Sequence, residues 1–263
     1  MKGERGVPVR LRFTKRGRVR FISHRDVARA FERAFRIARA PLAFTEGFNP
    51  HPRISFGLAL PTGTESDAEY LDVELTEETD LDRFAADVTE ALPEGMGVTG
   101  VEFLAARAAS LQQGVTSISY HVEAFFSDDG AWSPSDVEAW VQDVLAADAL
   151  VVSLRRKGRE VTDDLRPAIS ALEVEGPEAG SPPANPPSHD ATAIDTRATC
   201  VNVKLELSTQ PRNVRPEEVL ALVGPGCLSA RKVLRIEQWI ERDGSRLTPL
   251  EADTRPRAGI GAR

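Results

Sequence analysis

The sequence has little cysteine: Cys200 and Cys227 are the only two among its 263 residues. Two isolated thiols provide neither a disulfide framework nor the cysteine cluster of a zinc or iron–sulfur site, so we expect no cofactor and no metal. Long apolar runs are also missing, and no stretch approaches the roughly 20 residues that a membrane-spanning helix needs. The N-terminus lacks the apolar segment of a signal peptide, so we expect a cytoplasmic protein without membrane contact.

Several catalytic signatures are absent as well. The sequence contains no Walker loop, no Gly-x-Gly-x-x-Gly after a predicted strand, and no Gly-x-Ser-x-Gly nucleophile elbow. These absences argue against nucleotide hydrolysis, dehydrogenation, acyl transfer and radical initiation by the chain itself.

The charge, in contrast, is abundant and unevenly distributed. The formal net charge is -7, yet residues 1–56 hold 14 Lys and Arg against 4 Asp and Glu, whereas the remainder holds 19 against 36. A basic segment on an acidic protein indicates either a local anion-binding face or a helix face whose charges are paired with acidic residues elsewhere.

The first hundred residues show an alternation of strand and helix patterns. Apolar residues alternate with arginines at 9–13 and again at 18–21, which predicts a strand pair with four arginines on its polar side. Ser23 and Asp26 have capping-box spacing, and an apolar stripe from Val27 to Ala38 predicts a helix that ends before Pro41. Further strands are predicted at 53–60, 70–75 and 98–104, with a second helix over 81–92 and turn chemistry over 61–67.

A second, similar succession begins near residue 115. Strands are predicted at 117–126, 150–154, 169–174, 201–207 and 233–240, with helices at 133–145 and 215–223. Residues 176–198 are rich in Pro, Ala, Ser and Gly, which is typical of a flexible insertion. We therefore predict an α+β protein of two tandem ferredoxin-like units (βαββαβ) with antiparallel sheets, residues 1–110 and 111–242, followed by a disordered tail at 243–263.

The stretch from Phe44 to Gly57 is the most unusual part of the sequence. It combines three Phe, two Gly and two Pro with an Asn, a His and an Arg, a mixture that no periodic helix or strand needs. Pro50 and Pro52 fix φ on either side of His51, so we expect a stiff loop of the kind that often carries binding residues. Together with the arginines and the helix start, it predicts an RNA- or anion-binding site: Arg18, Arg20, Ser23, His24, Arg25, Phe48, Asn49, His51 and Arg53.

The two histidines in this set, His24 and His51, are also candidate catalytic residues. If the fold brings them together, they can act as general acid and base on RNA or on a small substrate. The alternative is structural: His24 packs at the helix start and His51 hydrogen-bonds within its own loop. Phe48 likewise either joins the core or stacks on a base.

Five further motifs stand out along the sequence: Arg18–Asp26, Phe31–Phe35, Pro41–Gly57, Leu60–Gly63 and Glu69–Val73. They resemble those of a bacterial family, the radical-SAM-linked domain of unknown function, which occurs alone or fused behind a radical SAM enzyme. The family more often carries Leu in place of Arg25 and Ser in place of Thr45, and it lacks the 176–198 insertion. The resemblance is specific over residues 9–105 and looser over 115–242.

The resemblance implies a radical SAM protein as partner, and an RNA-processing endonuclease as a neighbour of the family's genes. It carries over no catalytic residue. Our leading hypothesis is a non-catalytic accessory protein that binds RNA, such as tRNA or rRNA, or presents substrate to a radical SAM partner. The alternatives are an RNA-processing or RNA-modifying enzyme that uses His24 and His51, and a protein–protein adaptor.

Overall fold

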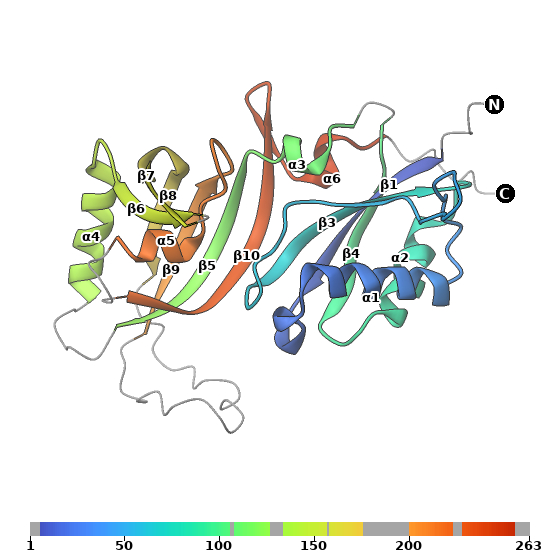
Figure 1. Ribbon diagram of the computed structural model, residues 1–263, viewed down its shortest axis with the longest axis horizontal. Coiled ribbons are helices and arrows are strands. Elements are labelled where there is room, and N and C mark those ends of the chain that lie inside the picture. Colours follow the sequence, from blue (N-terminus) through green and yellow to red (C-terminus); the bar gives the residue numbers. More distant parts are fainter. Residues whose placement is uncertain are drawn as a thin grey trace. The chain divides into compact units, whose positions relative to one another are not determined.

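The structure is a computed structural model that combines helices with a large, mostly antiparallel sheet, so the predicted α+β class is confirmed (Figure 1). The chain divides into two compact units, one of Met1–Thr116 with Arg235–Arg263 and one of Ser117–Leu234. The C-terminal residues from Arg235 onward thus belong to the first unit. The structure describes residues 6–105, 108–126, 134–156, 158–175, 200–222 and 228–255.

The first unit places two helices over a sheet. Strand β1 pairs antiparallel with β3 on one side and with β4 on the other, while β2 and β10 both border β3. The helices α1 and α2 lie side by side on one face of these strands (Figure 1). In chain order the elements are β1 (Val7–Lys15), η1 (Gly17–Phe21), α1 (His24–Ile37), β2 (Ile54–Phe56), β3 (Glu65–Leu75), α2 (Leu81–Ala91), β4 (Met96–Phe103), α3 (Leu111–Gly114), β10 (Leu228–Arg242), β11 (Ser245–Leu247) and α6 (Pro249–Ala252).

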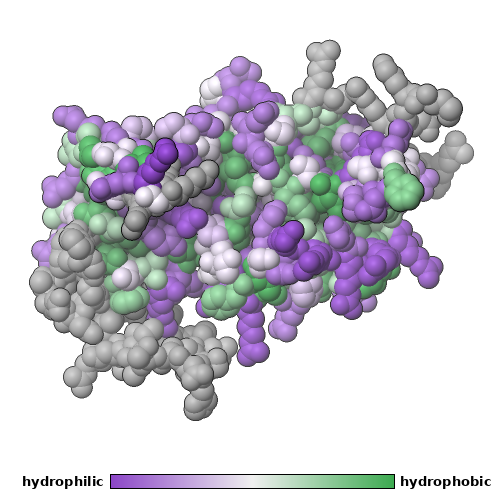
Figure 2. Space-filling model, viewed as in Figure 1, coloured by the Kyte–Doolittle hydropathy of each residue, from purple (hydrophilic) through white to green (hydrophobic). Residues whose placement is uncertain are grey.

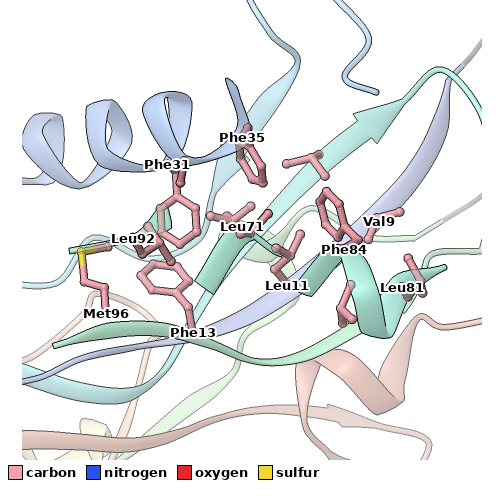
Figure 3. Packing of buried hydrophobic residues seen from close by; sticks show 14 of the residues in the cluster. Val9, Leu11, Phe13, Phe31, Phe35, Leu71, Leu81, Phe84, Leu92 and Met96 are labelled. Atoms are coloured by element: carbon pink, nitrogen blue, oxygen red, sulfur yellow. The ribbon is translucent and has the colours of Figure 1, made fainter. Parts of the chain in front are cut away.

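The core of this unit lies between the sheet and the two helices (Figure 3). Alternate residues of β1, among them Leu11 and Phe13, are buried beneath the apolar stripe of α1, as the sequence pattern predicts. Phe13 meets Phe31 of α1 edge to face with ring centroids 4.7 Å apart, and Phe35 stacks on Phe84 of α2 at 6.0 Å. Burying each such side chain contributes about 1.5–3 kcal/mol, which fixes α1 on the sheet.

The C-terminal segment covers β1 on the opposite side. Arg10, which is completely buried, donates to the carbonyl oxygen of Pro249 at 3.1 Å and lies 3.5 Å from the carboxylate of Asp253. Leu104 forms a bridge with Thr254, which extends this contact. The prediction of a disordered tail from residue 243 is therefore wrong for residues 243–255, because these contacts hold a segment that has no hydrophobic periodicity. Residues 256–263 lie outside the described residues.

The predicted second strand at 18–21 is also wrong, because residues 17–21 form the short 3-10 helix η1. Gly17 adopts φ +69, a conformation that favours glycine and turns the chain away from β1. The amide of Arg16 then donates to the carbonyl of Gly95 at 2.7 Å, which anchors the turn beside β4. Conversely, β3 begins at Glu65, within the stretch where turn chemistry is predicted.

The second unit repeats the alternation of strands and helices. Its strands β5, β9 and β8 are antiparallel neighbours in that order, and β10, whose residues belong partly to each unit, follows β5 in the sheet order. A separate hairpin pairs β6 with β7, a strand that the sequence pattern does not predict. The predicted insertion at 176–198 lies outside the described residues. The elements are β5 (Ser117–Phe126), α4 (Pro134–Ala146), β6 (Val151–Arg156), β7 (Arg159–Asp164), η2 (Arg166–Ala168), β8 (Ile169–Glu175), β9 (Cys200–Ser208) and α5 (Pro216–Leu220).

Candidate functional site

Ser23 and Asp26 form a capping box at the N-terminus of α1. The hydroxyl of Ser23 accepts from the amide of Asp26 at 3.3 Å, and the Asp26 carboxylate accepts from the Ser23 amide at 3.3 Å and from its hydroxyl at 2.7 Å. These hydrogen bonds hold the pKa of Asp26 below its usual value. The predicted capping box is thus confirmed, and the Asp26 carboxylate occupies part of the helix N-terminus to which an external anion would bind.

His24 follows this cap and borders a small pocket. Its ring meets Phe56 edge to face, with centroids 5.1 Å apart. The pocket has a volume of about 20 Å³, which is enough for about one water molecule. Its walls are Phe13, Lys15, His24, Val27, Phe56, Gly57, Leu58, Leu60, Glu69 and Tyr70.

Lys15 is the cation of this pocket. Its side chain is buried, and Nζ donates to the carbonyl oxygens of Arg20 at 3.2 Å and Ile22 at 3.1 Å, so it fixes the backbone of η1. Burial lowers the pKa of Lys15, although the nearby Glu69 carboxylate opposes the shift. Glu69 itself pairs with Arg235 at 2.9 Å, and burial raises its pKa.

Neither Lys15 nor Glu69 was identified as a site residue from the sequence. The signal for Lys15 was nevertheless present, because it continues the alternation of Val9, Leu11 and Phe13 and must therefore face inward. Lys15 positions the backbone that leads into α1, whereas Glu69 holds the side chain of Arg235.

The outer side of α1 carries a row of arginines, and hydrophilic side chains cover this region of the molecule in Figure 2. The helix also carries two exposed acidic residues, Asp26 and Glu32, and Asp26 pairs with Arg29 at 3.4 Å. The other arginines of this row, Arg25, Arg33 and Arg36, make no ion pair with any residue that the structure describes. We call the row, together with the exposed Arg18 of η1, the basic surface: Arg18, Arg25, Arg29, Arg33 and Arg36.

The other arginines of the predicted site are engaged elsewhere. Arg20 pairs with Glu65 at 3.2 Å, and Arg53 pairs with Glu74 at 2.7 Å. Arg10 and Arg12 alternate with the core residues of β1 and lie on the sheet face away from α1. Several charges of the basic segment are therefore paired with acidic residues of the protein, as one of the two interpretations expects, and the exposed arginines of the basic surface form a smaller group.

The unusual loop folds back on itself next to the C-terminal end of α1. Phe44 forms a bridge with Pro52, the amide of Thr45 donates to the carbonyl of His51 at 2.8 Å, and the hydroxyl of Thr45 accepts from the His51 amide at 3.0 Å. Phe48, Asn49 and the side chain of His51 are exposed.

His24 and His51 therefore occupy different places. His24 begins α1, a helix of 14 residues that spans about 20 Å, whereas His51 belongs to the loop that follows the other end. The bridge between Leu42 and Leu75 holds that loop near the end of β3, while His24 contacts Phe56, which is opposite Leu71. The two imidazoles do not form a general acid–base pair in this arrangement.

Two kinds of site are absent from the residues that the structure describes. Among them, no group of three or more His, Cys, Asp or Glu side chains is placed to hold a metal ion. No helix in the described ranges is long and apolar enough to cross a membrane.

Comparisons with known proteins place the chain in a broader context. A family model described as "Uncharacterized protein conserved in bacteria (DUF2344)" matches residues 9–216. No curated protein matches the chain.

Solved structures offer distant likenesses. One is a chain of a Cbf5-Nop10-Gar1 complex, with a TM-score of 0.49 and 8% identity over 90% of this chain and 54% of that chain. Another is a chain of an H/ACA RNP bound to a substrate RNA containing 2′-deoxyuridine, with a TM-score of 0.42 and 8% identity over 96% of this chain and 55% of that chain. The chain spans about half the length of each. At this identity and TM-score, neither likeness indicates a function.

Proposed function

The chain belongs to this family of uncharacterised bacterial proteins, and we propose that it is a non-catalytic accessory protein that binds RNA, such as tRNA or rRNA, through the basic surface. The observation that carries the proposal is the row of exposed arginines on α1, of which Arg25, Arg33 and Arg36 make no ion pair with a described residue. Arginines without acidic partners are available to an external anion.

The geometry of the row suits a phosphate backbone. Arg25, Arg29 and Arg33 follow one another at intervals of four residues, which corresponds to about 6 Å along a helix. Guanidinium groups bind phosphate oxygens through two parallel hydrogen bonds, so each arginine can engage a phosphate. Such contacts position a nucleic acid without reading its sequence, which is the property expected of a protein that holds RNA for another enzyme.

A radical SAM protein remains the partner that the sequence resemblance implies. In that arrangement the accessory protein holds the RNA or presents a substrate, and the partner performs the chemistry. The strand orders β4-β1-β3-β2 and β10-β5-β9-β8 support the proposal that each unit is a ferredoxin-like scaffold. In the first unit, that scaffold leaves the outer side of α1 facing solvent.

An RNA-processing or RNA-modifying enzyme is less well supported, because His24 and His51 lie at opposite ends of α1. The other alternative is an adaptor whose basic surface docks an acidic protein. This hypothesis uses the same arginines as RNA binding, so an experiment has to distinguish the two. Protein captured after nuclease treatment, with loss of that capture in Arg18→Glu, would indicate the adaptor.

The proposal is tested by filter binding of tRNA and rRNA fragments at about 50 mM and about 200 mM salt. We expect affinity to fall steeply with salt and Arg25→Glu to weaken binding to all RNAs, with the salt slope reduced by about one per lost phosphate contact. Arg83→Glu is the matched control: it makes the same charge change on α2, where Arg83 lies 3.7 Å from Asp87 and outside the basic surface. Absence of RNA binding at low salt would contradict the proposal, and equal losses in the two variants would contradict its placement on α1.

A further inference from the structure

A closed loop with aromatic residues adjoins the basic surface. We call residues Phe44–Pro52 the aromatic loop. Its two strands are held together by the Phe44–Pro52 bridge and by the two hydrogen bonds between Thr45 and His51. Gly47 adopts φ +128, a conformation that side chains disfavour, and Pro50 and Pro52 restrict the returning strand. The loop is thus fixed by its backbone and does not depend on its phenylalanines for its shape.

The phenylalanines of the loop face water. Phe48 is fully exposed and Phe44 is 54% exposed, and neither belongs to a described core cluster. An exposed phenyl ring contributes little to folding, because hydrophobic stabilisation requires its removal from water. A rigid loop that presents such a ring is therefore suited to binding, and the exposed Asn49 and His51 beside it can donate and accept hydrogen bonds.

The aromatic loop also continues the basic surface. Arg36 lies in the last turn of α1, and the exposed Arg39 follows the end of the helix. The chain then reaches the bridge of Leu42 with Leu75 and enters the loop, so exposed arginines and exposed rings follow one another along the chain after α1. A basic segment followed by exposed aromatic residues matches a ligand that carries both phosphates and flat rings.

We infer that the aromatic loop binds an unpaired nucleotide of an RNA whose phosphates lie on the basic surface, with the base stacked on Phe48. The inference rests on the proposed function and specifies its substrate as single-stranded RNA or an RNA loop. Bases in a duplex are stacked on one another and do not offer a face to Phe48, whereas splayed bases of single strands stack on aromatic side chains. A protein partner on the same loop is the competing outcome.

The test compares two RNAs with equal numbers of phosphates, one unstructured and one a perfect duplex, by fluorescence anisotropy. We expect Phe48→Ala to weaken binding of the single strand by about 5- to 150-fold, the effect of one lost stacking contact, and to leave duplex binding unchanged. Phe48→Trp retains a ring and should preserve affinity. The matched control is Phe21→Ala, which removes a ring that is 61% exposed in η1, before the other end of α1, and should have no effect.

A second readout reports stacking directly. A single strand containing 2-aminopurine should lose emission when it binds the wild-type protein, and should lose less when it binds Phe48→Ala. If wild type and Phe48→Ala bind the single strand with equal affinity, the inference about the aromatic loop is wrong. If Arg25→Glu still weakens RNA binding in that case, the proposed RNA function holds although the loop plays no part in it. If the wild-type protein binds neither RNA, both fail. If Phe48→Ala abolishes capture of a protein while RNA affinity is unchanged, the loop is a protein contact and the inference is wrong.

Discussion

Arg10 donates two parallel hydrogen bonds to Asp72 on the adjacent strand β3, from Nε to Oδ1 at 2.7 Å and from Nη2 to Oδ2 at 2.9 Å. The remaining contacts of the guanidinium are with the carbonyls of Ala109 and Pro249 and with Asp253. Because Arg10 is completely buried, this part of the basic N-terminal charge is unavailable to any ligand. The charge counted from the sequence is therefore larger than the charge that an external anion can reach.

Removing one member of the Arg10–Asp72 pair should lower the free energy of unfolding. Asp72→Ala leaves the Arg10 charge buried without its main partner, and we expect the free energy of unfolding to fall by roughly 3–5 kcal/mol. The control is Glu74→Ala, which breaks the half-exposed pair with Arg53 and should cost at most about 1 kcal/mol. Urea denaturation measures both, and equal losses would show that burial of Arg10 does not matter.

The cap of α1 should contribute measurably to stability. Ser23→Ala removes the acceptor of the Asp26 amide and should destabilise the protein by about 1 kcal/mol, whereas Ser23→Gly should cost only a few tenths. Because the folded-state pKa of Asp26 is lowered, its contribution is present above the unfolded pKa and is lost as the pH falls through the folded pKa. The urea concentration at the unfolding midpoint should therefore fall less on acidification in Asp26→Asn than in wild type.

Lys15 should make stability rise with pH on the alkaline side. Burial lowers its pKa in the folded state, so between that lowered pKa and the unfolded value near 10.5 the unfolded chain holds a proton that the folded protein has released. The free energy of unfolding must then increase with pH in this window. Urea unfolding from about pH 8 to about pH 10 should show this slope in wild type and a reduced slope in Lys15→Met.

Lys204→Met provides the control for this measurement. Lys204 is exposed and its hydrogen bond to Glu175 raises its pKa, so its contribution is lost only as the pH passes above the ordinary lysine value. The variant should keep the wild-type slope below that pH. A slope that persists unchanged in Lys15→Met would exclude Lys15 as its source.

Local patterns predicted much of the first unit. The alternation through Val9, Leu11 and Phe13 and the helical stripe through Phe31 and Phe35 identify β1 and α1, because burial of one face imposes the period of each element. The basic row of α1 follows from the same periodicity. These are features that each segment carries in its own residues.

Other features depend on distant partners and could not be predicted. Glu65 and Asp67 suggested a turn, but they lie at the start of β3, where Glu65 pairs with Arg20 and Asp67 with Arg16. Likewise, the segment around Asp253 has no periodic pattern and is ordered by Arg10, more than two hundred residues earlier in the chain. The distance between His24 and His51 also depends on the bridge between Leu42 and Leu75, which holds the loop of His51 at the end of β3. No local sequence pattern predicts that bridge.

The division of the first unit between residues 1–116 and 235–263 has a consequence for the gene. The codons for the basic surface and those for Pro249 and Asp253, which contact the buried Arg10, are separated by more than two hundred codons. A premature stop codon before residue 249 would leave the whole basic surface encoded, yet would remove Pro249 and Asp253 from the buried guanidinium. A truncation far from the arginines of α1 is thus expected to misfold the first unit and with it to abolish the proposed RNA binding.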